Sequence, residues 1–302
     1  MEITLATRNC DTAISSTLQY YAFFRYPLTA SEIHQRAAAC CTLKEVTEYL
    51  NELEILGQLY THEGYYTLLN DAPALVARRK AGKIQADKDL VQARRIGTFI
   101  YQFPFVKFVG ISGSLSKGFA DRNSDFDFFI VTSGNRLWIA RTLLHLFKKM
   151  TFAVGQQHKF CMNYFIDEHA LCLEEQNIYT ATELSSLLPI CGAACYHELM
   201  AANKWCIDFL PNWQKIKPEA TIKNNRTLAG KFAEWAINKF WPEHWNKKLM
   251  NLTDAKWQRK WARKDYPADD YGLAFKTTLH VSKNHKANYQ KKVLEQVNKK
   301  MN

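Results

Sequence analysis

The feature that most constrains the fold is a glycine-serine turn followed by two alternating aspartates. The turn is the segment Gly113-Ser114-Leu115-Ser116-Lys117-Gly118, and the aspartates stand in Ser124-Asp125-Phe126-Asp127. Apolar segments at 105–111 and 128–131 flank this stretch and predict two strands. Because alternate residues of a strand point to the same face, we expect Asp125 and Asp127 to lie side by side.

This arrangement favours a site for a metal ion and a phosphate. Two carboxylates at one spot do not both stay ionised cheaply without a cation. Mg²⁺ suits such a pair, because it binds one or two carboxylates together with substrate phosphates. Gly113 and Gly118 let backbone N–H groups approach an anion, while Ser114 adds a hydroxyl and Lys117 a positive charge. Metal and phosphate sites at one sheet edge are typical of phosphoryl or nucleotidyl transfer.

The same residues resemble the signature of the nucleotidyltransferase fold in the DNA polymerase beta superfamily, especially its minimal and kanamycin-type members. That signature is a Gly-Ser turn followed by Asp-x-Asp on the next strand, often with serine just before the first aspartate, as Ser124 is here. The resemblance implies that Gly113 and Ser114 hold the phosphates of a nucleoside triphosphate. It also implies that Asp125 and Asp127 hold the metal. We count Lys117 and Ser124 with the nucleotide-binding residues.

The family usually supplies a third carboxylate from a later strand, which the segment 159–167 predicts here. Asn163 and Asp167 share one face of that strand by alternation. One reading is that Asp167 joins Asp125 and Asp127 as a catalytic metal ligand. The others are a site of two carboxylates, to which the Asn163 amide oxygen could be added, and an ordinary structural role for Asp167.

A carboxylate base could come from the helical region after the catalytic strands, as in kanamycin-type relatives. Glu183 and Glu198 are candidates by position. The segment Thr180-Ala181-Thr182-Glu183 also has the pattern of a capping box, which explains Glu183 better as a helix cap.

The chain divides into three predicted parts, which give an α+β fold with a nucleotidyltransferase core. Residues 1–72 predict a winged-helix domain, with capping boxes at 29–32 and 42–45 and a hairpin at 59–68. Residues 73–175 predict the nucleotidyltransferase core, preceded by a charged linker helix. Residues 176–302 predict a helical, basic C-terminal region.

Charge bears on the partners. Residues 1–72 hold four Lys/Arg and nine Asp/Glu, whereas residues 203–302 hold twenty-one and nine. The second helix of the winged-helix region, 42–56, has four glutamates and one lysine, so we expect a protein contact or scaffolding role and not DNA binding. Trp257 and Trp261 lie on one helical face in the basic region. They fit either a core stripe or a base-stacking surface for RNA.

Cysteine usage and hydropathy bear on the compartment. The eight cysteines show no metal-like spacing, the start of the chain lacks the pattern of a signal peptide, and no apolar run is long enough to span a membrane. We therefore expect a cytoplasmic protein without membrane association.

The sequence thus predicts an Mg²⁺-dependent nucleotidyltransferase that binds ATP or another nucleoside triphosphate. The acceptor hydroxyl could belong to a small molecule, a protein or an RNA end. The alternative is a regulatory or scaffolding protein that senses nucleotide with the same fold and without chemistry.

Overall fold

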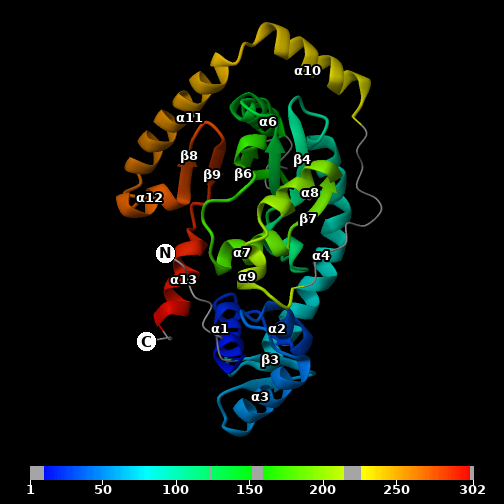
Figure 1. The fold of residues 1–302 in the computed structure, drawn as a ribbon, viewed down its shortest axis with the longest axis vertical. Coiled ribbons are helices and arrows are strands. Elements are labelled where there is room, and N and C mark those ends of the chain that lie inside the picture. Colours follow the sequence, from blue (N-terminus) through cyan, green and yellow to red (C-terminus); the bar gives the residue numbers. More distant parts are fainter. Residues whose placement is uncertain (1–9, 123, 152–158, 214–225, 300–302) are drawn as a thin grey trace.

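A computed structural model describes residues 10–122, 124–151, 159–213 and 226–299 as a mixed α+β fold (Figure 1). Its described strands form a central six-stranded sheet in the order β7-β4-β5-β6-β9-β8 and a three-stranded sheet in the order β1-β3-β2. In the central sheet β5 and β6 are parallel, and the other neighbouring pairs are antiparallel. The strands are β1 (Leu28–Thr29), β2 (Tyr60–His62), β3 (Tyr65–Thr67), β4 (Val106–Ile111), β5 (Asp127–Thr132), β6 (Cys161–Asp167), β7 (Leu188–Cys191), β8 (Phe275–Thr277) and β9 (Val281–Asn284).

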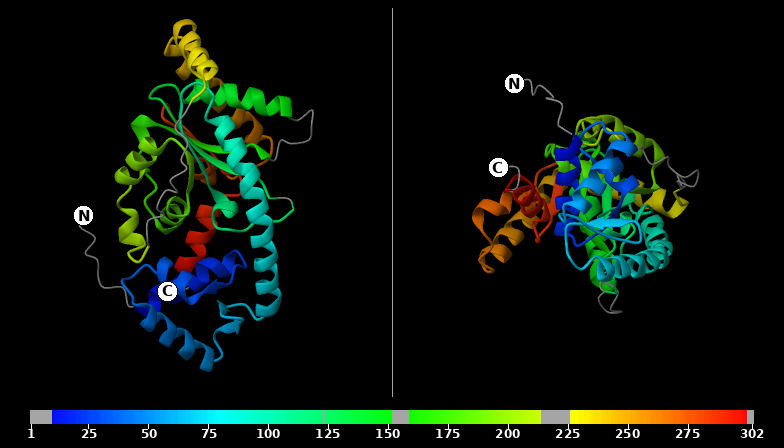
Figure 2. Two further views of the ribbon diagram at one scale, coloured as in Figure 1. Left: turned by 90° about the vertical axis from the view of Figure 1, so that its right-hand side faces the viewer. Right: turned by 90° about the horizontal axis from the view of Figure 1, so that it is seen from below.

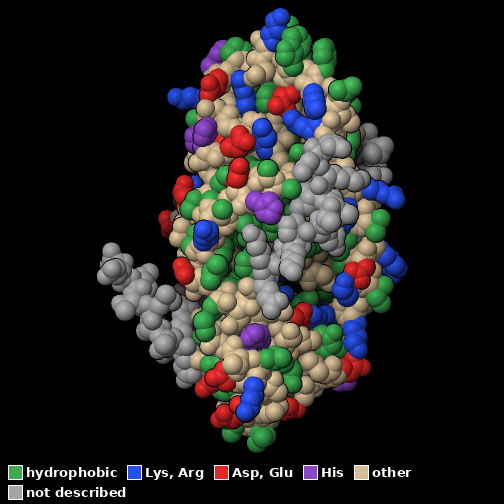
Figure 3. Space-filling model, turned by 45° about the vertical axis from the view of Figure 1, so that its right-hand side comes forward, with side chains coloured by type: hydrophobic (Ala, Val, Ile, Leu, Met, Phe, Trp, Pro, Cys, Tyr) green, Lys and Arg blue, Asp and Glu red, His purple; other side chains and the backbone are tan. Residues whose placement is uncertain are grey.

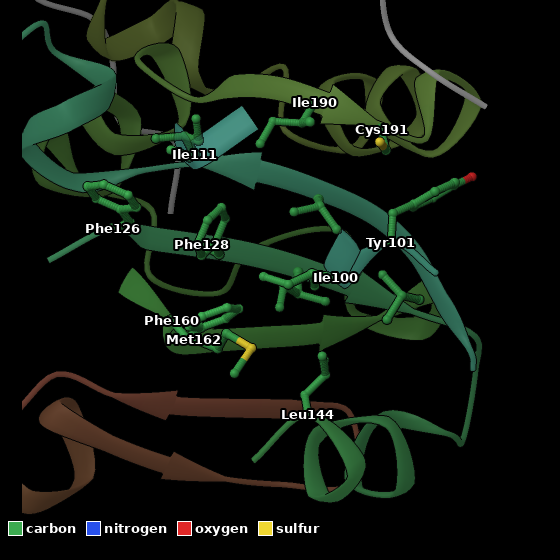
Figure 4. Close-up of a cluster of buried hydrophobic side chains, with 14 of the residues drawn as sticks. Ile100, Tyr101, Ile111, Phe126, Phe128, Leu144, Phe160, Met162, Ile190 and Cys191 are labelled. Carbon is green, nitrogen blue, oxygen red and sulfur yellow. The ribbon is translucent and has the colours of Figure 1, made fainter. Parts of the chain in front are cut away.

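Strand β5, in the middle of the central sheet, is buried on both faces, because its residues 128–131 are apolar without a polar alternation. On one face Phe128 and Ile130 pack with residues of α4 (Ala72–Ile100) and α6 (Leu137–Thr151), and Figure 4 shows this cluster. On the other face Phe129 and Val131 pack with residues of α7 (Ile178–Ser185), α8 (Ala193–Ala202) and α9 (Cys206–Phe209). Asp127 is two residues before Phe129 on the same strand, so its side chain points to the same face, the one covered by α7.

The N-terminal elements surround a second hydrophobic core at one end of the molecule. They are α1 (Cys10–Phe23), α2 (Ala30–Arg36), α3 (Leu43–Ile55) and the strands β1 to β3. Both predicted capping boxes are confirmed: Thr29 and Glu32 open α2, and Thr42 and Glu45 open α3. A disulfide joins Cys10 to Cys41, a pairing that the scattered cysteine positions did not predict.

Helix α4 is the predicted linker helix, and it runs along the molecule from the N-terminal elements to the central sheet (Figure 2). Its buried side is lined with small residues, which bring other parts of the chain close to its backbone. A Cβ built on Gly82 would overlap the Phe119 ring, and one built on Gly97 would overlap the side chain of Ile190. The helix therefore contacts both the segment after the glycine turn and strand β7.

The prediction that residues 176–302 are helical is wrong in part, because this region contributes β7, β8 and β9 to the central sheet. Pro189 lies within β7, and a proline at this position would interrupt a helix that ran through it. The helices of the region beyond α9 are α10 (Leu228–Phe240), α11 (His244–Ala262), α12 (Ala268–Ala274) and α13 (Tyr289–Lys299). Short strands in polar surroundings carry little periodic signal, so β8 and β9 were not predicted.

The C-terminal helix α13 returns to the N-terminal elements, although the two are far apart in the sequence (Figure 1). Val293 is fully buried in the N-terminal core, and the Tyr289 ring contacts the rings of Phe23 and Phe24. The ends of the described chain are thus tied together. Among the described helices, none combines the length and the apolar character needed to cross a membrane.

Candidate functional site

The glycine turn follows β4 and takes the form of a short helix, α5 (Gly113–Ser116). Gly113 and Gly118 both have positive φ angles, 69° and 73°, which side chains adopt only with strain. A Cβ built on Gly113 would overlap the Oδ2 atom of Asp127. The absence of a side chain at position 113 is therefore what lets the Asp127 carboxylate lie directly against the turn. Ser114 is exposed on α5.

The two aspartates stand at the start of β5, on either side of a buried anchor. Asp127 is its first residue and is half-buried, whereas Asp125 precedes the strand and is exposed. Phe126 is buried between them and fixes this end of the strand in the core. The backbone N–H of Ser112 donates to the Asp127 carbonyl at 2.9 Å, which ties the entry of the turn to the same strand end.

The carboxylates at this end of the sheet interact electrostatically, and this affects the pKa of Asp127. The pKa of Asp127 is raised to about 6, mainly by burial and in addition by the negative charges of Asp125 and Glu183. A hydrogen bond from Cys161 and the charge of Lys117 oppose this rise. Asp127 thus has the perturbed titration that is common at functional sites.

Glu183, on α7, lies near Asp127, although the sequence pattern explained it as a helix cap. The capping prediction is wrong: α7 begins at Ile178, and the side chain of Asn177 caps it by accepting from the N–H of Thr180. Glu183 is therefore inside the helix and free to pair elsewhere. Its Oε1 accepts from Lys117 Nζ at 2.8 Å, and the same ammonium donates to the Gly113 carbonyl at 3.1 Å.

Lys117 and Ser124 have clear local positions. The Lys117 ammonium is held between Glu183 and the glycine turn, and both side chains of this ion pair are largely buried. Ser124 closes the loop before the aspartates, because its hydroxyl accepts from the N–H of Asp121 at 2.8 Å and contacts the Asp121 carboxylate at 3.1 Å. Lys117 thus faces the predicted site, whereas Ser124 shapes the loop that leads to it.

The structure does not bring Asp167 together with Asp125 and Asp127. In the parallel pairing of β5 with β6, Asp127 is opposite Cys161, whereas Asp167 is opposite Thr132 at the other strand end. At the rise of a strand, five residues span roughly 16 Å. Asp167 is 0% exposed, and its carboxylate accepts from the N–H groups of Asn135 and His169 and contacts His280 Nδ1 at 2.9 Å. These contacts explain it as a structural acid.

The neighbouring strand offers no carboxylate beside Asp127. The residue opposite is Cys161, whose thiol pKa is raised by burial and by the charge of Asp127, so the thiol stays protonated. The Asn163 amide donates to Cys161 Sγ at 2.9 Å. Glu198 is exposed on α8. Burial is the main cause that raises the pKa of the Cys195 thiol, and the negative charges of Glu168 and Glu198 contribute to the rise. Glu198 therefore lies at the same place as Glu168, which follows Asp167, and not beside the aspartates of β5.

The donor set fits a metal ion only when phosphates complete it. Within the described ranges, no three His, Cys, Asp or Glu side chains are placed to hold a metal by themselves. Mg²⁺, however, commonly takes one or two carboxylates and fills its other positions with phosphates and water. Asp125 and Asp127, next to a turn suited to phosphate, match that requirement.

The glycine turn and the start of β5 both lie within one segment that is similar to a known protein family. Residues 94–177 match the family model described as nucleotidyltransferase domain. The chain therefore contains such a domain, consistent with a member of the DNA polymerase beta superfamily. Comparison with the curated proteins gives no match, and comparison with the solved structures gives none. Glu183 lies just beyond the matched residues.

Proposed function

We propose that this protein transfers a nucleotidyl group from a nucleoside triphosphate to an acceptor hydroxyl in an Mg²⁺-dependent reaction. The single observation that carries the proposal is the contact of the Asp127 carboxylate with the glycine turn. This contact brings a carboxylate that could bind a metal next to the backbone that we assign to the phosphates. The family match at residues 94–177 supports the general reaction.

In the proposed reaction, the residues of the glycine turn, the two aspartates, Lys117 and Glu183 have different roles. The backbone of Gly113 and Ser114 binds the phosphates, and Asp125 and Asp127 hold the metal that comes with them. Bound Mg²⁺ would neutralise phosphate charge and favour in-line attack at the α-phosphate. The Lys117 ammonium sits against the turn, and Glu183 keeps it there through their 2.8 Å ion pair. Glu183 is thus a positioning residue in this account.

The N-terminal part, residues 10–68, is proposed to be a winged helix. Its elements follow the order α1-β1-α2-α3-β2-β3, and β1 pairs with β3 beside the β2–β3 hairpin. The acidic surface of α3 makes it a surface for protein contacts and not for DNA. We therefore do not propose duplex DNA as the acceptor of the reaction.

A second function is favoured by one observation, the lack of a carboxylate at the β6 position opposite Asp127. A domain with two metal-binding carboxylates could bind nucleotide without transferring it. The protein would then report nucleotide levels through its N-terminal part to a partner.

Pyrophosphate release separates these two functions. The full chain is incubated with Mg²⁺, each of the four nucleoside triphosphates in turn, and pools of small molecules, proteins or RNA as acceptors. Transfer predicts pyrophosphate that depends on acceptor and disappears in Asp125→Asn. Tight triphosphate binding with no release from any pool would support the sensing function instead.

A further inference from the structure

A pocket of about 470 Å³ lies behind the glycine turn, between that turn, helix α4 and the N-terminal elements. It does not contain Asp125 or Asp127. Its lining residues come from the segments before β1 and after α5 and from α2, β3 and α4. They are Tyr26, Glu32, Tyr65, Arg79, Lys80, Lys83, Ile84, Lys117 and Gly118.

The pocket lining has an excess of positive charge, with four cations and one carboxylate. Arg79 forms a fixed part of the wall. Its guanidinium carbon lies 4.4 Å from the Tyr26 ring centre and 4.7 Å from that of Tyr65, and its Nη2 donates to Glu32 at 2.6 Å. Glu32 thus balances Arg79, and Glu183 from outside the lining balances Lys117, so Lys80 and Lys83 supply the remaining charge.

The two lysines of α4 are the adaptable part of the pocket. Lys80 pairs with Glu63 and Lys83 with Asp87, and all four side chains are about half exposed or more. Exposed ion pairs contribute at most about 1 kcal/mol. An anion in the pocket can therefore draw both ammonium groups away from these partners at small cost. Figure 3 shows Lys and Arg side chains on the side of the molecule along which α4 runs.

The pocket shares backbone with the glycine turn. The Tyr26 hydroxyl donates to the Lys117 carbonyl at 3.1 Å, which joins the N-terminal elements to the end of the turn. A Cβ built on Gly118 would lie 3.5 Å from the Cδ atom of Lys83, so the Lys83 side chain passes over this glycine. A group bound between Lys83 and Arg79 would therefore lie directly behind the turn that we assign to the triphosphate.

We propose that this pocket binds the phosphate group of a small molecule, separately from the nucleoside triphosphate. The inference rests on the proposed function for the position of the triphosphate. The size of the pocket is within the range for small-molecule sites. A long polyanion is disfavoured, because the surrounding residues 1–72 hold nine acidic and four basic side chains. A phosphate monoester matches a pocket that combines the cations Arg79, Lys80 and Lys83 with the rings of two tyrosines.

Binding of inorganic phosphate to the full chain tests the proposal. Phosphate is titrated by calorimetry in buffer with EDTA, so that no metal-dependent site contributes. The double variant Lys80→Gln and Lys83→Gln should bind phosphate roughly tenfold or more weakly, since charged hydrogen bonds of about 1.5–3 kcal/mol are lost. The exposed Lys88, on the same helix outside the pocket lining, gives the matched control Lys88→Gln, which should bind as the parent does.

Two further arms identify the source of the phosphate. In buffer with Mg²⁺ in place of EDTA, saturating MgATP should leave phosphate binding intact, and Asp125→Asn should not change it either. Displacement of phosphate by MgATP would overturn the proposal, because the pocket would then belong to the triphosphate site. No phosphate binding by the parent, or equal binding by the double variant, would also overturn it. Failure of the proposed function shows elsewhere, as MgATP binding that survives Asp125→Asn.

Discussion

Among single residues, the contact between Gly113 and Asp127 matters most for the proposed function. The local motif predicted both residues, because a strained glycine turn and a strand start are coded within a short segment. The same motif could not predict Glu183, whose partner Lys117 is 66 positions away and is brought to it by the packing of α7. Of the two interpretations of Asp167, the strand register contradicts the one as a metal ligand. Alternation gives the face of a strand residue and not its register with the next strand.

Replacing Gly113 by alanine should weaken MgATP binding and lower stability. The Cβ would overlap Asp127 Oδ2, and the φ angle of 69° costs about 1–2 kcal/mol for a residue with a side chain. Gly64→Ala is the matched control, since Gly64 has a φ of 76° and nothing within 4 Å of its Cβ position. Both variants should lose stability in urea unfolding, but only Gly113→Ala should lose nucleotide. Equal nucleotide binding by both would show that the contact is unimportant.

The pKa of Asp127 predicts how stability depends on pH. Its value of about 6 in the folded protein is above the ordinary 3.8, so the folded state takes up the proton more readily. The stability contributed by the protonated form is complete below pH 3.8 and is lost as pH rises through about 6. Asp127→Asn should therefore stabilise the metal-free protein at pH 8, by up to about 3 kcal/mol.

At pH 4 the same substitution should have much less effect on stability. Chemical unfolding of parent and variant at the two pH values, with EDTA present, measures the difference. A gain at pH 8 no larger than that at pH 4 would mean that the Asp127 carboxylate is not destabilised by its surroundings.

Among the helices and strands, features that depend on a few neighbouring residues were predicted well. Features that depend on contacts with distant parts of the chain were not. The capping boxes of α2 and α3 lie within four residues, and both formed. The box proposed at Thr180 did not form, because Asn177 offers an earlier cap and burial of Ala181 and Leu184 fixes the helix register. Strand β9 pairs with β6, and β8 pairs with β9, and a local pattern does not reveal these partners.

The two tryptophans of α11 act as core residues, as one of the two interpretations predicted. Trp261 is 9% exposed and stacks on Phe275 with ring centres 4.7 Å apart, which joins α11 to β8. Trp261→Ala should destabilise the protein by roughly 3–5 kcal/mol in urea unfolding. Trp235→Ala on α10 is the control, since Trp235 is 58% exposed and should change stability little. A small effect at Trp261 would argue that α11 is not anchored through this residue.

At the scale of the whole molecule, the termini and the charge distribution matter most. Helix α13 completes the N-terminal core through Val293, so the sequence-based division into three consecutive parts does not describe three independent cores. Nothing local in residues 289–299 indicates that partner, because an amphipathic helix specifies an apolar face and not what covers it. Experiments on the N-terminal part therefore require the full chain.

The full chain should not bind duplex DNA through α3. This helix carries Glu45, Glu48 and Glu52 together with Glu54, against Lys44 alone, and phosphate contacts provide most of the affinity for DNA. Charge reversal of these four glutamates to lysine should therefore create or strengthen binding, measured by fluorescence anisotropy at low salt. Salt-sensitive binding by the parent that this reversal abolishes would contradict the acidic-surface argument.

The central claim is that Asp125 and Asp127 hold a metal-bound triphosphate against the glycine turn, and MgATP binding tests it most directly. Calorimetric titration at pH 8 compares the parent with Asp125→Asn, Asp127→Asn and the control Glu198→Gln, whose side chain is exposed on α8. Circular dichroism confirms that each variant is folded. The account predicts that both aspartate variants lose at least roughly tenfold in affinity, as expected when a charged ligand bond is removed, while Glu198→Gln binds like the parent. Unchanged MgATP binding by both folded aspartate variants would contradict it.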